Sequence, residues 1–220
     1  MSSASTSIVQ RVPPLFPSRW LQGYARGKLK TDPVYRASRE LIGASDLPLL
    51  DIGCGMGLHA FYLRECGYTA PIIGIDVDAR KIVAGQRAIA KASYKDISLQ
   101  LGDGAKLPEF SGHVSMLDVL HYFPSSEQPA VLASIAARVA PGGWCIIRTS
   151  PADGTWRFRM TQLEEMLAAG IAWMSQPAIS FPTVASVEAA FSTELFEHDI
   201  RPLWGRTPFN SWLLAFRKRG

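Results

Sequence analysis

The chain has 220 residues, of which 47% are hydrophobic and 19% charged, and its formal net charge is +4. This length suits one α/β domain with additions, and no apolar run reaches the roughly 20 residues that a membrane-spanning helix needs. The N-terminus has no basic segment followed by an apolar one, so no secretion signal is indicated. We therefore expect a cytoplasmic protein with no membrane partner.

Cysteines and basic residues are placed without a functional pattern. The three cysteines, Cys54, Cys66 and Cys145, fall in a predicted loop, a helix end and a core strand. Their odd number and scattered placement argue against a disulfide framework or a zinc site, so no metal is expected. Nucleic-acid binding requires a concentrated basic patch, and none is visible in the sequence. We expect no nucleic-acid partner, and the oligomeric state is left open.

The N-terminal region divides into a predicted tail and two predicted helices. Residues 1–7 are rich in Ser and Thr, and residues 12–17 contain three prolines, which disfavour a helix. We therefore expect residues 1–18 to form a flexible tail that is extended at 12–17. A short helix should follow at 18–28, and a second one at 33–43, where Asp32 can cap a helix that begins with proline.

The middle of the chain alternates apolar strand patterns with helical patterns. We expect strands at 48–52, 72–76, 98–102, 114–120 and 144–149, and helices at 58–66, 79–92 and 127–139. Such alternation predicts an α/β fold, a doubly wound, mostly parallel sheet with helices on both faces. Ligands of such sheets bind at the carboxyl ends of the strands.

The C-terminal third is less regular. Residues 156–170 have apolar side chains at roughly helical spacing, and residues 171–181 are apolar. A helix is expected at 183–191. Two final strands are expected at 195–203 and 211–217, joined by a loop that contains glycine and proline.

A glycine-rich segment, Asp-Ile-Gly-Cys-Gly-Met-Gly at 51–57, follows the first predicted strand and precedes a predicted helix. Glycine allows a sharp turn and a close approach of the backbone to a ligand. The third glycine, Gly57, comes one position too early for the dinucleotide fingerprint, and Leu58 fills the place where that glycine would stand. A glycine-rich turn without a ligand is the alternative interpretation.

Four consecutive predicted strands each carry an acid at or just after their ends, and the first of these acids is Asp51. Asp76 ends the second strand at the interval expected for an acid that accepts hydrogen bonds from ribose hydroxyls. Asp103 follows the third strand and Asp118 the fourth.

Together with the pattern D-x-G-x-G-x-G, the four acids resemble the class I S-adenosylmethionine-dependent methyltransferases over roughly residues 49–150. The resemblance implies a Rossmann-like sheet of seven strands with an antiparallel last strand, and S-adenosylmethionine as the cofactor. It also implies the cofactor-binding residues, which are Asp51, Gly53, Cys54, Gly55, Gly57, Asp76, Val77, Asp103, Gly104 and Asp118.

The same resemblance suggests how the acceptor is bound. Residues 19–45 are interpreted as an N-terminal helical lid, and residues 156–180 as an insert that roofs the substrate pocket, within one domain at 19–220. The residues expected to contact the substrate are Tyr24, Tyr122, Trp156 and Arg157. The alternative for both segments is that their aromatic residues only pack on the core.

His121 is the candidate general base. It lies three residues beyond Asp118, near the expected position of the methyl group, and histidine suits base catalysis near neutral pH. The alternative is a packed or exposed loop histidine. His59, His113 and His198 are interpreted as structural.

The sequence favours methyl transfer to a small molecule, most readily to an oxygen of an aromatic or apolar acceptor. No Asn/Asp-Pro-Pro-Tyr motif, typical of amino-methylating nucleic-acid enzymes, follows the fourth strand. A non-catalytic module that binds the cofactor and regulates a partner is the main alternative. A nicotinamide-dependent dehydrogenase is disfavoured by Leu58 in the place of the third glycine.

Overall fold

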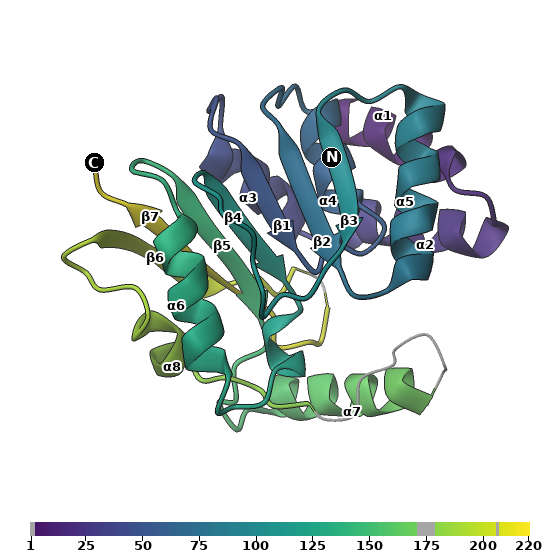
Figure 1. Ribbon diagram of the computed structural model, residues 1–220. Coiled ribbons are helices and arrows are strands. Elements are labelled where there is room, and N and C mark those ends of the chain that lie inside the picture. The colour runs from purple at the N-terminus through teal and green to yellow at the C-terminus, as the bar shows by residue number, and fades with distance from the viewer. Residues whose placement is uncertain (1–2, 171–178, 206) are drawn as a thin grey trace.

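The computed structural model describes residues 3–170, 179–205 and 207–220. Its strands form one seven-stranded sheet in the order β3-β2-β1-β4-β5-β7-β6 (Figure 1). The strands are β1 (Leu49–Ile52), β2 (Ile72–Asp76), β3 (Ile97–Leu101), β4 (His113–Leu117), β5 (Trp144–Thr149), β6 (Phe196–Pro202) and β7 (Trp212–Lys218).

The pairing of the strands confirms the predicted sheet. The pairs β1–β2, β2–β3, β1–β4 and β4–β5 are parallel, whereas β7 runs antiparallel to both β5 and β6. The carboxyl ends of β1 to β5 therefore meet at one edge of the sheet. β4 ends at Leu117, three residues before the predicted end, because Asp118 adopts a left-handed backbone with φ of 57°.

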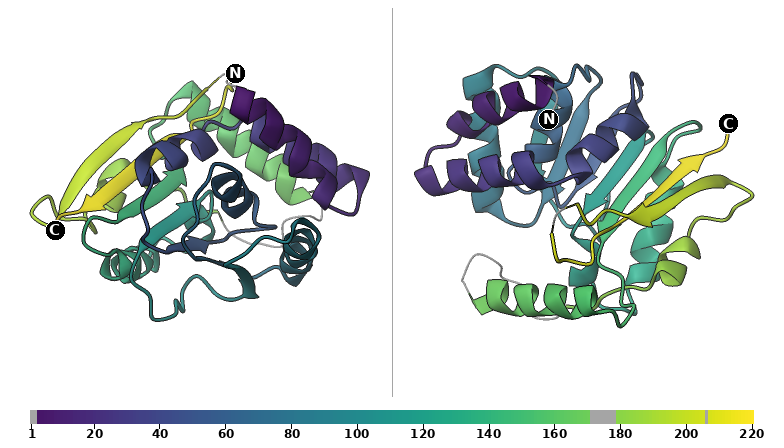
Figure 2. Two further views of the ribbon diagram at one scale, coloured as in Figure 1. Left: turned by 90° about the horizontal axis from the view of Figure 1, so that it is seen from above. Right: turned by 180° about the vertical axis from the view of Figure 1, so that it is seen from behind.

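Helices cover both faces of the sheet, as predicted. Residues of α1 (Ser3–Arg11), α2 (Arg19–Thr31), α3 (Val34–Ile42), α4 (Leu58–Glu65) and α5 (Ala79–Ala92) share one core with strand residues such as Leu49 and Ile146. A second core joins α6 (Gln128–Arg138) and α8 (Val184–Glu188) to Leu50 and Ile147. Adjacent strand residues enter opposite cores because side chains alternate along a strand. Figure 2 shows α2 and α3 crossing the face opposite to α6 and α8.

The N-terminal segment differs from the prediction. α1 is helical where disorder was expected, and Pro13–Leu15 forms a 3₁₀ helix where an extended chain was expected. The physical reason is the spacing of Ile8, Val12 and Phe16, which places three apolar side chains on one side, where all three are buried. Pro13 and Pro14 stand at the start of the 3₁₀ helix, where a missing N–H is tolerated.

Two further elements lie near the carboxyl edge of the parallel strands. α7 (Trp156–Gly170) lies beneath the carboxyl ends of the parallel strands in Figure 1. Leu120–Tyr122 forms a 3₁₀ helix just after β4. The predicted roof extends to residue 180, and its part at 171–178 lies outside the described residues. Over the described ranges, no helix combines the length and the apolar character that crossing a membrane would require.

Candidate functional site

A cavity of about 1060 Å³ opens at the carboxyl edge of the sheet. It brings together the ends of β1 to β4 with side chains from α2 and α3. Of the cofactor-binding residues predicted from the sequence, all but Gly57 line this cavity, and so do Tyr24 and Tyr122. His121, Trp156 and Arg157 are not among its lining residues. A volume near the upper end of the usual range for ligand pockets, roughly 300–1,000 Å³, leaves room for two ligands.

The glycine loop shapes the floor of the cavity. Gly53 and Gly57 have φ of 69° and 83°, a backbone that side chains rarely adopt. A Cβ atom at Gly53 would lie 2.2 Å from a methyl group of Val119. The amides of Gly53 and Cys54 donate to the carbonyl oxygen of Ile75 at 2.8 and 3.0 Å. The loop is therefore held against β2 by backbone bonds. Burial raises the pKa of the Cys54 thiol well above its usual value, so it stays protonated.

Asp51 belongs to a buried chain of polar groups. Ser115 donates its hydroxyl to Asp51 Oδ1 at 2.6 Å, and His59 Nδ1 lies 3.3 Å from the same oxygen. The other nitrogen of His59 lies 2.7 Å from the hydroxyl oxygen of Ser38. These contacts orient the carboxylate beside the loop. His59 also lines the cavity, and its contact with Asp51 could not be found from the sequence.

Asp76 and its neighbours form the next part of the site. Asp76 accepts hydrogen bonds from the amides of Gly55 and Asp78, each at 2.8 Å, one on each oxygen. Each carboxylate oxygen can accept a further bond, so the fixed carboxylate can still bind hydroxyl groups. Val77 beside it is exposed, and Asp103 accepts a bond from the amide of Ala105.

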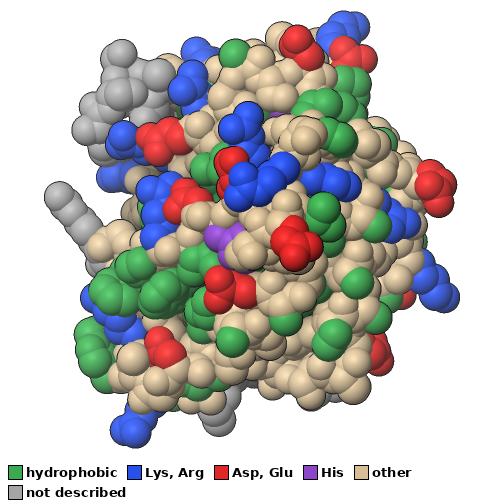
Figure 3. Space-filling model, turned by 90° about the vertical axis from the view of Figure 1, so that its left-hand side faces the viewer, with side chains coloured by type: hydrophobic (Ala, Val, Ile, Leu, Met, Phe, Trp, Pro, Cys, Tyr) green, Lys and Arg blue, Asp and Glu red, His purple; other side chains and the backbone are tan. Residues whose placement is uncertain are grey.

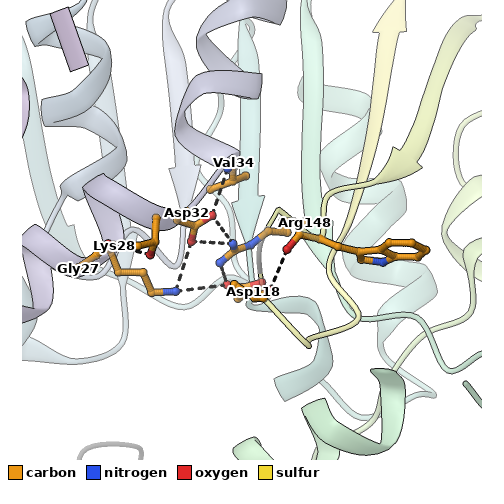
Figure 4. A network of polar contacts seen from close by, with 9 residues as sticks. Gly27, Lys28, Asp32, Val34, Asp118 and Arg148 are labelled. Atoms are coloured by element: carbon orange, nitrogen blue, oxygen red, sulfur yellow. Dashed lines mark hydrogen bonds and ion pairs between the residues drawn. The ribbon is translucent and has the colours of Figure 1, made fainter. Parts of the chain in front are cut away.

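Asp118 is part of an ion-pair network that joins three elements (Figure 4). Arg148, in β5, pairs through Nη2 with Asp118 Oδ2, and its Nη1 lies 2.6 and 2.7 Å from the two carboxylate oxygens of Asp32. Lys28, in α2, lies farther away, 3.5 Å from Asp32 and 4.0 Å from Asp118. Burial opposes ionisation of Asp32, but the charges of Arg148 and Lys28 outweigh it and lower its pKa.

His121 is buried next to Tyr122, which lines the cavity, whereas His121 does not. Its side chain is 3% exposed, and its ring centroid is 4.2 Å from that of Tyr122 and 5.5 Å from that of Phe181. Burial lowers the pKa of His121 to about 4, so the imidazole is neutral at pH 7. A neutral imidazole can accept a proton, but the described conformation does not bring this one to the cavity.

Arg157 contacts a loop near the C-terminus and the ring of the neighbouring Trp156. The guanidinium carbon of Arg157 lies 4.8 Å from the centre of the Trp156 ring and 4.6 Å from that of Trp204. Its Nη1 donates to the carbonyl oxygen of Thr207 at 2.6 Å. These contacts tie α7 to the connection between β6 and β7. Tyr24, by contrast, faces the cavity and stacks on Trp20.

Comparison with known protein sequences gives matches over part of the chain. Residues 49–143 match the model of a family described as a methyltransferase domain. An uncharacterized protein of Synechococcus is 30% identical over 124 residues, which are 54% of this chain and 29% of that protein. A ribosomal protein L11 methyltransferase of Burkholderia vietnamiensis is 30% identical over 95 residues, 43% of this chain and 29% of that protein. This chain thus spans less than a third of the length of either relative.

Solved structures resemble the chain over nearly its whole length. The magnesium protoporphyrin IX methyltransferase of Synechocystis PCC 6803, solved with bound SAH, superimposes with a TM-score of 0.67 at 19% identity. That match covers 98% of this chain and 95% of the other. The pyocyanin biosynthetic protein PhzM matches with a TM-score of 0.64 at 13% identity, over 97% of this chain and 61% of the other. At these identities the likeness concerns the fold alone.

Proposed function

We propose that the chain, whose residues 49–143 match a methyltransferase domain family, is a class I S-adenosylmethionine-dependent enzyme that methylates a small molecule, at an oxygen of an aromatic or apolar acceptor. The observation that supports this most is a shared cavity of about 1060 Å³, in which the four strand-end acids and several aromatic side chains meet. Binding a donor and an acceptor side by side requires such a shared space, because methyl transfer depends on their proximity and orientation.

S-adenosylmethionine is the cofactor of this family, and the residues present fit it. Asp76 would accept hydrogen bonds from the ribose hydroxyls, Val77 and Asp103 would lie beside the adenine, and Asp51 and Asp118 would face the cationic methionine end. The glycine loop would bring its backbone close to the ligand. When bound, the cofactor supplies a methyl group already activated on a sulfonium, so the chain has to orient the acceptor and exclude water.

We assign the aromatic part of the lining to the acceptor. Tyr24 from α2, Tyr35 from α3 and Tyr122 after β4 line the cavity. Burial raises the pKa of Tyr35 well above its usual value, so its phenol stays neutral. Flat apolar acceptors match such walls. We keep His121 as the proposed base, and its ring would have to reach the cavity past Tyr122. Trp156 and Arg157 are proposed to support the roof from outside.

Two other acceptor classes are less well supported. Some relatives are named ribosomal protein methyltransferases, but the match to one of them spans only 95 residues, 43% of this chain. On the face shown in Figure 3, Lys and Arg are interspersed with Asp and Glu, which does not favour nucleic acid there. A cytoplasmic location and a cofactor-binding regulatory role without catalysis stay predictions from the sequence.

The test is a methyl-transfer assay with radiolabelled S-adenosylmethionine. A panel of phenolic and carboxylic aromatic compounds would be compared with ribosomal protein and with RNA. We expect label in at least one small aromatic compound. Label only in the macromolecules would overturn the acceptor class. Tight cofactor binding without transfer to any of them would favour the regulatory alternative.

A further inference from the structure

We infer that Arg148 is a positioning residue of the methyl-donor site, which acts by holding the carboxylate of Asp118 toward the cavity. The inference rests on the proposed role of Asp118 in binding the methionine end of the cofactor, and it does not depend on the acceptor. Arg148 is distant from the glycine loop in sequence and lies inside an apolar strand.

The guanidinium of Arg148 is buried, and two carboxylates, those of Asp32 and Asp118, balance its charge. It is 8% exposed, and a charge that is removed from water to this extent is stable only when paired. Nη1 of Arg148 donates to both carboxylate oxygens of Asp32, and Nη2 of Arg148 pairs with Oδ2 of Asp118. The planar fork of arginine can satisfy two carboxylates in fixed directions, which the single ammonium of lysine cannot do.

Asp118 depends on this contact for its orientation. Its side chain is 37% exposed and lines the cavity. Its amide donates to the carbonyl oxygen of Arg148 at 2.9 Å, so the same residue holds both its backbone and its side chain. A carboxylate on a turn after a strand would otherwise choose among several rotamers. Arg148 therefore selects the rotamer that faces the ligand.

Lys28 offers a matched control because it faces the same two carboxylates. Its distances of 3.5 and 4.0 Å are longer than the roughly 2.7–2.9 Å of a strong charge-assisted bond, and its side chain is 35% exposed. Removing it takes away one positive charge from the network without releasing either carboxylate from Arg148.

The test is a double-mutant cycle on S-adenosylhomocysteine binding, measured by calorimetry with the full chain. Arg148→Met and Asp118→Asn should each weaken binding about tenfold, and the double variant should be no weaker than Asp118→Asn alone, within about threefold. Lys28→Met, which also removes a positive charge beside both carboxylates, should weaken binding less than Arg148→Met does. A merely structural role of Arg148 would instead lower affinity equally in both backgrounds.

Each outcome decides something. Additive losses, or wild-type affinity in Arg148→Met, would overturn the inference. Wild-type affinity in Asp118→Asn would overturn it too, together with the role of Asp118, while the proposed methyl transfer would stand. If thermal melting shows that Arg148→Met does not fold, Arg148→Lys takes its place in the cycle. Lysine keeps the positive charge but lacks the two-nitrogen geometry of the guanidinium. Arg148→Lys should therefore lower the affinity less than Arg148→Met, and it should cause no further loss when combined with Asp118→Asn.

Discussion

The two ends of the cavity are built in different ways. At the cofactor end, Asp76 and the glycine loop are held by backbone amides and by neighbouring residues of β1 and β2. At the proposed acceptor end, the walls come from separate segments, such as Tyr24 in α2 and Tyr122 after β4. The cofactor end thus depends on local backbone geometry, whereas the acceptor end depends on the packing of side chains brought together by the whole fold.

The largest effect is expected at Asp76, in the cofactor end. Asp76→Ala should weaken S-adenosylhomocysteine binding about a hundredfold or more, because two charge-assisted bonds of about 1.5–3 kcal/mol each would be lost. Calorimetry gives the affinity, and thermal melting reports the fold. An unchanged dissociation constant would contradict the proposed role of Asp76 in cofactor binding. A collapse of the melting temperature would show that Asp76 is mainly structural.

The next effect concerns His121, in the acceptor end. If it is the base, His121→Ala should lower kcat about a hundredfold, the usual scale for loss of a general base. Cofactor affinity should barely change, because the side chain lies on the far side of Tyr122 from the cavity. His121→Asn, which keeps a polar side chain, serves as the control for packing. Near-normal turnover would show that the imidazole serves packing and that catalysis relies on orientation.

Buried histidines should make stability depend on pH. Burial lowers the pKa of His113 and of His121 to about 4, below the ordinary 6.5. The unfolded chain therefore binds more protons between pH 6.5 and 4, and stability should fall as the pH drops through that window, by up to about 1.4 kcal/mol per pH unit for each histidine. Denaturant unfolding at several pH values measures this. His121→Asn should flatten the slope, and an unchanged slope would mean that His121 titrates normally.

The difference in unfolding free energy between two glycine variants separates backbone strain from packing in the glycine loop. Gly53→Ala should cost about 2–4 kcal/mol, because it adds a clash with Val119 to the strain of a left-handed backbone. Gly142 has a similar φ of 73° but open space around it, so Gly142→Ala should cost only about 1–2 kcal/mol. Equal losses of unfolding free energy in the two variants would show that the contact with Val119 is unimportant.

The cofactor end could be predicted from the sequence because its signals are local. Asp51, Asp76, Asp103 and Asp118 each stand at or near the end of an apolar strand, and the topology of a parallel sheet brings such ends together. The sheet itself was predicted for the same reason, since alternating patterns of strand and helix are visible in short windows.

The remaining features depend on contacts that no short window contains. Arg148 pairs with Asp32, which is 116 residues away. His121 is close to Asp118 in sequence, but the 3₁₀ turn at Leu120–Tyr122 directs its ring into the interior. The N-terminal helix was not predicted, because α1 is rich in Ser and Thr and its buried residue, Ile8, packs in a core with residues distant in sequence.

The most direct test of the account is a calorimetric titration of the full chain with S-adenosylhomocysteine and, in parallel, with NAD. The early third glycine and the strand-end acids around one cavity predict one site for S-adenosylhomocysteine and no measurable binding of NAD. Tighter binding of NAD, or no binding of S-adenosylhomocysteine, would contradict the central claim that this cavity is a methyl-donor site.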